Sequence, residues 1–263
     1  MSNPQGVAVV TGASSGIGAT YADRLAAQGY DLLLVARRAD RLAELAARLS
    51  AQYGVQVETL VLDLANASDL ARLEARLQAE PVAVLINNAG VGALGPTAAT
   101  GADAQEALIR LNIVALTRLS LAALAGFRKS GEGALVNIAS VLAYGPSAGG
   151  ASYSGSKAYV LNFTRSLQQE YADSRIRIQA VLPGPIRTEF FKAQGLPDSI
   201  FPDTAYISAD ALVDAALAGL AKGEQITVPT LVSPALWDDI EGKRLAFLGE
   251  VTGGRVAERY LQT

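Results

Sequence analysis

The sequence predicts an α/β fold in which a doubly wound parallel sheet carries helices on both faces. Short apolar runs alternate along the chain with longer segments whose apolar residues recur at helical spacing. Glycine or polar residues follow several of these runs, at the sheet edge where ligands bind in such folds. The chain contains no Ser/Gly linker, repeat or low-complexity segment. We therefore expect residues 1–263 to form a single domain.

Strands are expected where mostly apolar runs are too short to be helices. These runs cover residues 6–10, 31–35, 55–62, 82–86, 134–138, 177–182 and 225–228. The run 82–86 is apolar throughout, which is typical of a strand that is buried on both faces of a parallel sheet.

Helices are expected where apolar residues recur three or four positions apart. These segments cover residues 19–28, 40–53, 67–79, 103–129, 152–172 and 213–220. In the second of them, Leu42, Leu45 and Leu49 share one face. The remainder from Thr230 onward is expected to be mixed helix.

The region after the strand 177–182 has little regular pattern and contains several prolines. A long irregular segment of this kind suggests a substrate lid at about 185–208. A surface loop without a role would show the same pattern.

The composition excludes several kinds of chemistry. Without cysteine there are no disulfides or thiolate sites, and without histidine there is no Ser-His-Asp triad or usual zinc site. Acid–base chemistry must then fall to Tyr, Lys, Asp or Glu, and we expect no metal site. The net charge of −3 gives no reason to expect a nucleic acid or an acidic membrane as a partner.

Two segments bear on the location of the protein. Residues 1–5 carry no basic residue and no leader-like apolar stretch, so we expect no signal peptide. The apolar stretch 111–127 is interrupted by Asn112 and Arg118, which favours a buried helix over a membrane span. We expect a soluble, cytoplasmic protein.

The stretch from Thr11 to Gly18 lies between the first expected strand and the first expected helix. Gly12 allows a tight turn, Gly16 lets phosphates approach the backbone, and Gly18 lets the helix pack closely on the sheet. The N–H groups of the helix N-terminus would then face an anion. The spacing G-x-x-x-G-x-G differs from the common dinucleotide pattern, and an ordinary strand-to-helix turn is the alternative.

Tyr153 and Lys157 are four positions apart on an expected helix, so they share a face. A free tyrosine titrates near ~10, and a nearby ammonium favours the phenolate and lowers that pKa. Such a tyrosine can exchange a proton with a substrate oxygen near neutral pH. The pair is the best acid–base candidate in a chain without histidine, although a solvated helix face would show the same spacing.

Polar residues also follow other expected strands. Ser140 could hydrogen-bond a substrate oxygen, and the Asp63 carboxylate could accept a bond from an adenine amino group. The turn Asn88 to Gly90 lies at the same expected ligand edge. Asn112 is a poor residue for a helix interior, so it could hold a water or a backbone group. Each residue alone also suits an ordinary turn, cap or packing hydrogen bond.

Arg37 and Arg38 follow the second expected strand, where a dinucleotide fold usually places a carboxylate on the ribose 2′-hydroxyl. Two guanidinium groups stand there instead, and guanidinium pairs well with phosphate. We therefore expect a 2′-phosphate, and hence NADP(H) over NAD(H). Two solvated arginines at the start of a helix are the alternative.

Together these residues resemble the single-domain short-chain dehydrogenase/reductase family over residues 6–188. The residues that carry the resemblance are Thr11-Gly12-Ala13-Ser14-Ser15-Gly16-Ile17-Gly18, Asp63, Asn87-Asn88-Ala89-Gly90, Asn112, Ser140, Tyr153, Lys157, Pro183-Gly184 and Thr188. The resemblance implies a Rossmann-like fold and an NADP(H) cofactor. It also implies a homodimer or homotetramer, built partly from the two long helices around Asn112 and Tyr153.

The resemblance further implies catalytic roles. Tyr153 would be the general acid/base, Lys157 would lower its pKa and bind the nicotinamide ribose, and Ser140 would orient the substrate oxygen. Asn112 would hold a water in a proton relay with Lys157.

A larger set of residues would line the cofactor site by the same resemblance. This set comprises Gly12, Ser14, Ser15, Gly16, Ile17, Gly18, Arg37, Arg38, Asp63, Leu64, Asn88, Ala89, Gly90, Tyr153, Lys157, Pro183, Gly184, Ile186 and Thr188. Within it, Ile186 and Thr188 would meet the nicotinamide carboxamide, and Asp63 the adenine.

The chain departs from the family pattern in two places. NADP-preferring relatives often carry a basic residue just before the second glycine, where this chain has Ser15. Phosphate selectivity would then rest on Arg37 together with Arg38. From Thr230 onward the chain differs from the short ending of the 3-oxoacyl-carrier-protein reductases.

The sequence thus predicts an NADPH-dependent carbonyl reductase, reversible as an alcohol dehydrogenase, for a bulky hydrophobic ketone, aldehyde or secondary alcohol. Apolar residues in loops beyond the strand ends form the expected substrate site, or else pack the lid onto the body. They are Leu142, Tyr144, Phe190 and Phe191, with Val91, Leu94, Leu196 and Phe201. The alternatives are reduction of 3-oxoacyl thioesters and NADP(H) sensing without turnover. The intact Ser140, Tyr153 and Lys157 argue against a sensor.

Overall fold

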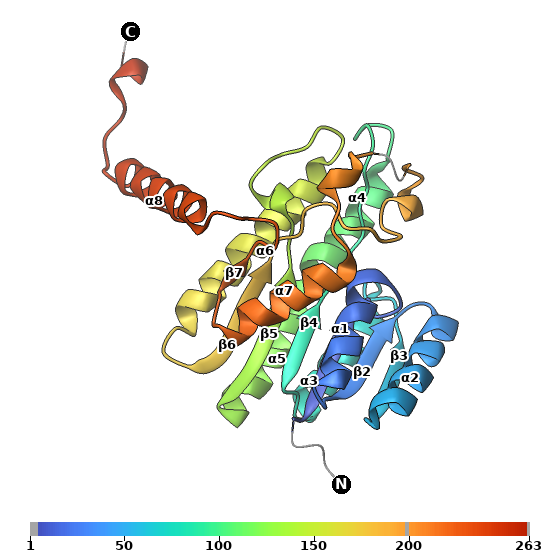
Figure 1. Ribbon diagram of the computed structural model, residues 1–263. Helices are drawn as coiled ribbons and strands as arrows, with labels where there is room; N and C mark the ends of the chain where they lie inside the picture. Colours follow the sequence, from blue (N-terminus) through green and yellow to red (C-terminus); the bar gives the residue numbers. More distant parts are fainter. Residues whose placement is uncertain (1–4, 198–199, 262–263) are drawn as a thin grey trace. The chain divides into compact units, whose positions relative to one another are not determined.

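The computed structural model describes residues 5–197 and 200–261 (Figure 1). These residues divide into two compact units, one that extends to Pro229 and one that begins at Thr230. Residues 1–4, on which part of the signal-peptide prediction depends, and residues 198 and 199 of the expected lid lie outside the described residues.

Seven parallel strands form one sheet in the described part of the chain. They are β1 (Val7–Thr11), β2 (Asp31–Ala36), β3 (Val57–Val61), β4 (Val84–Asn87), β5 (Glu132–Ile138), β6 (Arg175–Val181) and β7 (Ile226–Thr227). Their order is β3-β2-β1-β4-β5-β6-β7, so the chain winds outward from β1 in one direction and from β4 in the other. This confirms the predicted doubly wound sheet. Ligands bind in such sheets beyond the carboxyl ends of the strands, at the switch between β1 and β4.

Helices cover both faces of this sheet (Figure 1). They are α1 (Gly16–Ala27), α2 (Ala39–Tyr53), α3 (Ala67–Ala79), α4 (Ala102–Ile109), α5 (Leu116–Ser130), α6 (Ala151–Glu170) and α7 (Ala209–Ala221). Successive residues of β1 point to opposite faces: Ala8 and Val10 pack with α1, α2 and α7, and Val9 packs with α3, α5 and α6. The sheet therefore lies between two apolar cores.

A π-helical segment, Arg110–Ala115, joins α4 to α5, so the expected helix 103–129 is one continuous helical stretch with a local widening. Such single-turn π segments often occur at functional sites. By length and composition alone the stretch Ala102–Ser130 could cross a membrane, but half of its most apolar window is buried within the protein. Leu119 and Phe127 of α5 belong to the core, as expected for a buried helix.

Several boundaries differ from the predicted ones by a few residues. The first helix begins at Gly16 and not at residue 19, because Ser15 is extended and forms the N-cap. The expected strand 55–62 is reduced to Val57–Val61, and the last strand to Ile226–Thr227. These two strands, β3 and β7, are the outermost strands of the sheet. Each pairs with a neighbour on one side only, so an apolar run predicts the paired residues less well there.

Residues 185–197 and 200–208 have little regular structure, as expected. They contain two 3₁₀ turns, Lys192–Gln194 and Asp203–Ala205. Ile186 and Ile207 form an isolated parallel bridge that joins the two ends of the segment. We call these residues the lid segment, and their action as a substrate lid stays a prediction.

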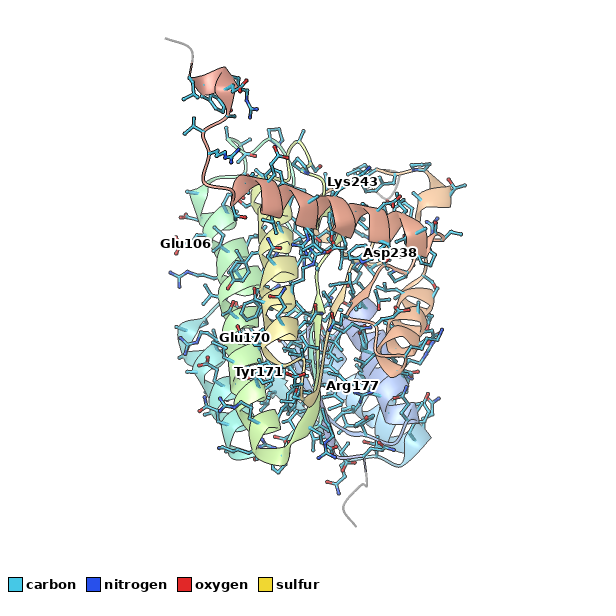
Figure 2. All side chains as sticks on the ribbon, turned by 90° about the vertical axis from the view of Figure 1, so that its left-hand side faces the viewer. Glu106, Glu170, Tyr171, Arg177, Asp238 and Lys243 are labelled. Carbon is cyan, nitrogen blue, oxygen red and sulfur yellow. The ribbon has the colours of Figure 1, made fainter. Side chains whose placement is uncertain are left out.

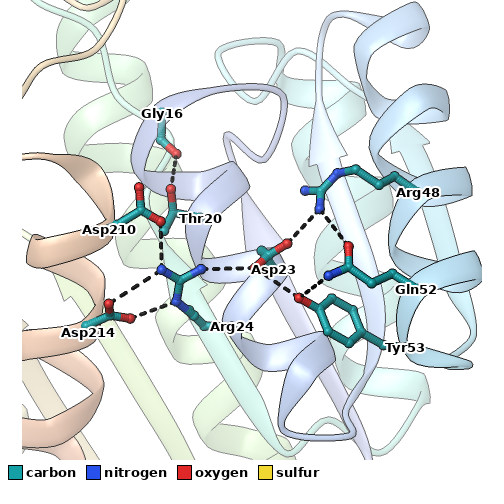
Figure 3. A network of polar contacts seen from close by, with 9 residues as sticks. All are labelled: Gly16, Thr20, Asp23, Arg24, Arg48, Gln52, Tyr53, Asp210 and Asp214. Carbon is teal, nitrogen blue, oxygen red and sulfur yellow. Dashed lines mark hydrogen bonds and ion pairs between the residues drawn. The ribbon is translucent and has the colours of Figure 1, made fainter.

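A polar network ties α1 to the helices on either side of it (Figure 3). Arg24 donates to Asp214 and Asp210 of α7 at 2.7 Å each, and to Asp23 at 3.0 Å. Arg48 of α2 donates to the other oxygen of Asp23 at 2.7 Å. The helices of this face are therefore joined by ion pairs outside the apolar core.

The second unit contains the helix α8 (Pro234–Val251) and a 3₁₀ turn at Glu258–Tyr260. Pro234 begins the helix, where a missing N–H is tolerated. All residues of α8 are exposed or half-buried, and Asp238 and Lys243 project from it in Figure 2. The mixed-helix expectation is met here, whereas the inclusion of this unit in one domain of residues 1–263 stays a prediction.

Candidate active site

The glycine-rich stretch forms the turn from β1 into α1. Gly12 has a φ of +67°, a left-handed conformation that other residues rarely adopt. A Cβ on Gly18 would lie 2.3 Å from the Gly12 carbonyl oxygen, so the start of the helix packs directly on the strand end. The amide of Asn88 donates to the carbonyl oxygens of Thr11 and Gly12 at 2.9 and 3.3 Å. This turn is therefore fixed against the loop after β4.

Thr11 links the same two loops, although the sequence pattern assigns no separate role to it. Its Oγ1 accepts the N–H groups of Asn88 and Ala89, each at 3.0 Å, and donates to the Ile86 carbonyl at 3.2 Å. These bonds fix the backbone that leads to Gly90. A Cβ placed on Gly90 would lie 3.3 Å from Asn112 Oδ1, so a side chain at this position would contact Asn112.

The loop after β2 brings Arg38 onto the glycine-rich turn. Its Nε and Nη2 donate to Ser14 Oγ at 3.1 and 3.0 Å, and Nη2 donates to Ser15 Oγ at 2.6 Å. Arg37 lies exposed on the same loop. The Arg38 guanidinium is therefore bound to the turn, whereas Arg37 is open to solvent and its contact with a phosphate stays a prediction.

The loop after β3 contributes less through its side chains. Asp63 Oδ1 accepts the Ala65 N–H at 3.0 Å, which fixes the turn, and Asp63 is half-buried. The side chain of Leu64 packs into the core. Contact between Leu64 and a ligand must therefore come from its backbone.

Ser140, Tyr153 and Lys157 converge at the carboxyl end of β5. Ser140 lies two residues after the end of β5 and hydrogen-bonds the phenol of Tyr153. Lys157 Nζ lies 5.6 Å from the centroid of the Tyr153 ring and donates to the Ile138 carbonyl at 2.8 Å. The sequence spacing placed Tyr153 and Lys157 on one helix face, and the structure adds Ser140 from a different element.

The pKa values of the pair bear on one expectation. Burial raises the pKa of Tyr153 to about 12, and its hydrogen bond with Ser140 offsets part of that increase. Burial also lowers the pKa of Lys157 to about 8. The tyrosine pKa in the protein by itself is thus raised and not lowered, because burial of the phenol is the largest influence on it, and the lowering by Lys157 stays a prediction.

Asn112 lies in the π-helical segment and is almost fully buried. Its Oδ1 accepts the Val91 N–H, and its Nδ2 donates to the Val91 carbonyl, each at 2.9 Å. Nδ2 also donates to Ser156 Oγ at 3.2 Å, and Ser156 donates to the carbonyl of Tyr153 at 2.7 Å. Asn112 therefore joins the loop after β4 to the helix of Tyr153, whereas its role in holding a water stays a prediction.

The loop after β6 reaches back over the glycine-rich turn. The Pro183 carbonyl accepts the Val141 N–H at 3.0 Å and lies 3.4 Å from Ser140 Oγ, so this loop also supports the serine. Gly184 is half-buried and Ile186 is buried. Thr188 Cγ2 lies 3.0 Å from the position of a Cβ on Gly16, which places it over the turn.

The expected substrate residues do not act as one group. The centroids of the Phe190 and Tyr153 rings are 5.6 Å apart, so Phe190 borders the Tyr153 phenol. Phe191 packs against Phe190 and Phe201 within the lid segment, with ring centroids 5.4 and 5.8 Å away. Tyr144 is exposed, with the Arg165 guanidinium 5.6 Å from its ring centroid.

The other expected substrate residues lie along the loops that meet the lid segment. They are Leu142, Val91, Leu94 and Leu196, all half-buried. The N–H of Leu94 donates to Gln194 Oε1 at 3.2 Å, which joins the loop after β4 to the lid. Part of the expected set thus packs the lid, as the alternative interpretation held.

The residues present fit a dinucleotide. Lys157 can donate three hydrogen bonds, and among bonds between described residues its buried ammonium makes one. The Nζ lies 3.8 Å from the position of a Cβ on Gly90, so a side chain there would crowd the ammonium. A glycine-lined turn and an ammonium with free donors are what the phosphates and a ribose would need.

Two residues that contact the site were missed at the sequence level. Glu189 accepts a hydrogen bond from Arg38 at 2.9 Å, and Gln194 donates to the Phe190 carbonyl at 2.9 Å. Glu189 follows Thr188 directly, and an acid next to an expected cofactor residue was the available signal. No pattern pointed to Gln194, because its partners depend on the course of the lid.

Comparison with known proteins agrees with this geometry. The family model described as short chain dehydrogenase matches residues 6–197. The very-long-chain 3-oxoacyl-CoA reductase of Anas platyrhynchos is 32% identical over 190 residues, which cover 70% of this chain and 61% of that protein.

Two solved structures resemble the protein over almost its whole length. A short-chain dehydrogenase from Sphingobium yanoikuyae, in complex with NADPH, is 44% identical with a TM-score of 0.93, and the match covers 97% of this chain and 99% of that one. The bulky-bulky ketone specific alcohol dehydrogenase from Comamonas testosteroni is 37% identical with a TM-score of 0.89, covering 97% and 98%. Because the family match extends over most of the chain and the sheet has the same Rossmann-like order, the protein belongs to the short-chain dehydrogenase family and is an oxidoreductase of that family.

Proposed function

We propose that the protein is a carbonyl reductase, reversible as an alcohol dehydrogenase, for hydrophobic ketones, aldehydes or secondary alcohols. The observation that carries the proposal is the convergence of Ser140, Tyr153 and Lys157 beside the glycine-rich turn. The cofactor is NADP(H). The Sphingobium relative is in complex with NADPH, and Arg37 and Arg38 supply guanidinium groups where a 2′-phosphate would lie.

The side chains have distinct tasks in this reaction. Bound NADPH supplies the hydride to the carbonyl carbon. Tyr153 donates its phenolic proton to the carbonyl oxygen, and Ser140 orients that oxygen through its hydroxyl group. Because burial holds the Tyr153 pKa at about 12, the protonated phenol that reduction needs is fully populated at neutral pH. Lys157 can donate three hydrogen bonds and gives one to the Ile138 carbonyl. The others are available to ribose hydroxyls, which would satisfy this buried ammonium.

The alcohol substrate of the reverse reaction must lose its proton to the phenolate of Tyr153. A raised pKa makes that form scarce near neutral pH, so the rate of alcohol oxidation should increase as the pH rises. The phenyl ring of Phe190 beside Tyr153 makes the surroundings of the reacting carbon apolar. A bulky apolar carbonyl compound suits these surroundings, and the Comamonas relative is named for such ketones.

Reduction of 3-oxoacyl thioesters is the second candidate. The Anas relative is named as a reductase of such substrates. Reduction of a hydrophobic ketone and reduction of a 3-oxoacyl thioester both act on a carbonyl group that carries an apolar chain. The same residues would perform the chemistry, so the two candidates differ only in the substrate.

The experiment that tests the proposal is cofactor oxidation with NADPH and then NADH over a panel of small and bulky ketones, aldehydes and 3-oxoacyl thioesters. We expect NADPH-selective turnover that is fastest with bulky apolar ketones. Turnover of thioesters alone would favour the second candidate. Tight NADPH binding without turnover across the panel would contradict both and favour a cofactor sensor.

A homodimer or homotetramer and a cytoplasmic location complete the proposal. Ile109, Val114 and Leu121 are exposed apolar residues on the stretch around Asn112, and Tyr159 is exposed on α6. A self-association surface on these two helices would cover them. Light scattering of the purified protein tests this, and a monomer at micromolar concentration would contradict it.

A further inference from the structure

The lid segment places a carboxylate on the guanidinium groups that follow β2. Glu189 Oε2 accepts a bond from Arg38 Nη1, and Glu189 Oε1 accepts one from Arg41 Nη1, each at 2.9 Å. The hydrogen bonds with Arg38 and Arg41 lower the pKa of Glu189, so its carboxylate is ionised at neutral pH. All three side chains are about half-exposed, so a solute can reach this cluster.

Arg38 belongs at the same time to the glycine-rich turn. Its Nε and Nη2 are bound by Ser14 and Ser15, which leaves Nη1 directed to Glu189. One guanidinium group therefore connects the turn, the start of α2 and the lid. Because Thr188 lies directly over Gly16, Glu189 fixes the lid at the point where it crosses the turn.

An added phosphate cannot share this site with the carboxylate. A phosphate monoester carries roughly −1.5 to −2 charges at neutral pH and takes the same guanidinium donors as a carboxylate. Asp40 and Glu44 already act electrostatically on Arg41 beside Glu189. A further anion next to Glu189 would be repelled, so the phosphate and the carboxylate compete for these guanidinium groups.

We propose that Glu189 is a latch that the 2′-phosphate of NADP(H) displaces from Arg38 and Arg41. The proposal rests on the assignment of the 2′-phosphate to Arg37 and Arg38. Glu189 sets the affinity for the 2′-phosphate by competing with it. Its displacement frees the lid segment when the phosphorylated cofactor binds, whereas a cofactor without the phosphate leaves the latch in place.

Binding of 2′,5′-ADP and of 5′-AMP, measured by calorimetry, tests the competition without turnover. The two nucleotides differ by the 2′-phosphate alone. In Glu189→Gln we expect 2′,5′-ADP to bind about three- to thirtyfold more tightly than in the native protein, the range that two half-exposed ion pairs allow. Binding of 5′-AMP should be unchanged.

Glu44→Gln is the matched control. It removes the same charge from an exposed residue that acts on Arg41 but does not bond Arg38. We expect it to alter the ratio of the two affinities less than twofold. An equal gain in affinity for 2′,5′-ADP in both variants would mean that the loss of one negative charge explains the effect. That result would overturn the latch.

Hydrogen exchange of the amides of residues 190–196 tests the displacement itself. In the native protein, 2′,5′-ADP should accelerate exchange there and 5′-AMP should not. In Glu189→Gln the exchange should be fast before any nucleotide is added. Unchanged exchange in the native protein with bound 2′,5′-ADP overturns the displacement.

The outcomes separate this inference from the proposal on which it rests. If the native protein binds both nucleotides equally, the assignment of the 2′-phosphate to Arg37 and Arg38 fails, and the latch fails with it. If the native protein prefers 2′,5′-ADP and Glu189→Gln keeps the same ratio, only the latch fails.

Discussion

Two regions border the candidate site, and they are held in different ways. One is formed by the loops at the carboxyl ends of the strands, called the sheet edge below, and the other is the lid segment. At the sheet edge, Thr11 and Asn112 make buried or half-buried hydrogen bonds to the backbone of neighbouring loops. In the lid, Glu189 and Gln194 bond through exposed or half-buried groups. The loops around the candidate site are therefore preorganised in the free protein, whereas the contacts of the lid can be exchanged at low cost.

The largest effect is expected at the sheet edge, from Tyr153→Phe. This change removes the hydroxyl that we propose as the proton donor and keeps the ring, so kcat should fall by about 10²- to 10⁴-fold. Steady-state reduction of the best ketone with NADPH measures it. Tyr159→Phe makes the same change at an exposed position of the same helix and should keep its activity. Full turnover of Tyr153→Phe would exclude the tyrosine as the acid.

Lys157→Met should stabilise the free protein in a pH-dependent way. The pKa of Lys157 is about 8 in the folded state and about 10.5 when unfolded, so below pH 8 both states are protonated and the folded state carries the full cost of a buried ammonium. Between about pH 8 and 10.5 the unfolded state alone binds the proton, so native stability rises with pH relative to the variant. We expect a gain of about 2–3 kcal/mol for the variant at pH 7, which disappears towards pH 10.5.

Urea unfolding of both proteins at pH 7, 8, 9 and 10 measures this difference. Lys192→Met, at an exposed position, should show no such trend. A gain for Lys157→Met that is the same at every pH would mean that the ammonium is not desolvated in the free protein.

Asn112→Ala should destabilise the sheet edge, which is the more rigid of the two regions. It leaves the N–H and carbonyl of Val91 without their side-chain partner and removes one of the two bonds of Ser156, so the free energy of unfolding should fall by about 2 kcal/mol. Asn66→Ala removes an exposed helix cap and should cost about 1 kcal/mol. If urea unfolding shows no greater loss for Asn112→Ala, the sheet edge is not preorganised by this side chain.

Gln194→Ala should have the smallest effect on global stability. It removes the bonds to Leu94 and to the Phe190 carbonyl in a segment with few other anchors, so the loss should stay below about 1 kcal/mol. The Leu94 amide should nevertheless exchange faster with solvent. A loss as large as that of Asn112→Ala would make the lid part of the cooperative fold and remove the contrast between the two regions.

The same contrast explains what could be predicted from the sequence. Gly12, Gly18 and the Tyr153–Lys157 pair were predictable because strand ends and helical spacing fix them locally. The raised pKa of Tyr153 was not, because it depends on how much of the phenol is buried by the lid and the loops. The Arg38–Glu189 contact joins residues that are far apart in the chain, and no local pattern encodes it.

The π-helical segment is another feature that the periodic pattern could not give. Asn112 is a poor residue for a helix interior, and this low propensity is the one local sign of an irregularity at this position. The extra residue in this turn, which no apolar repeat reveals, places the side chain towards Val91 and Ser156.

The bridge between Ile186 and Ile207 has a consequence for how the protein can change. The Arg187 N–H donates to the Ile207 carbonyl at 3.1 Å, and the Ile207 N–H donates to the Pro185 carbonyl at 3.3 Å, so the loop is closed at its base. Insertions, deletions or replacements beyond Phe190 in this loop need not disturb the strands, α7 or Thr188. We therefore expect the loop to behave as an exchangeable cassette, through which the fold can acquire new substrates during evolution or by grafting.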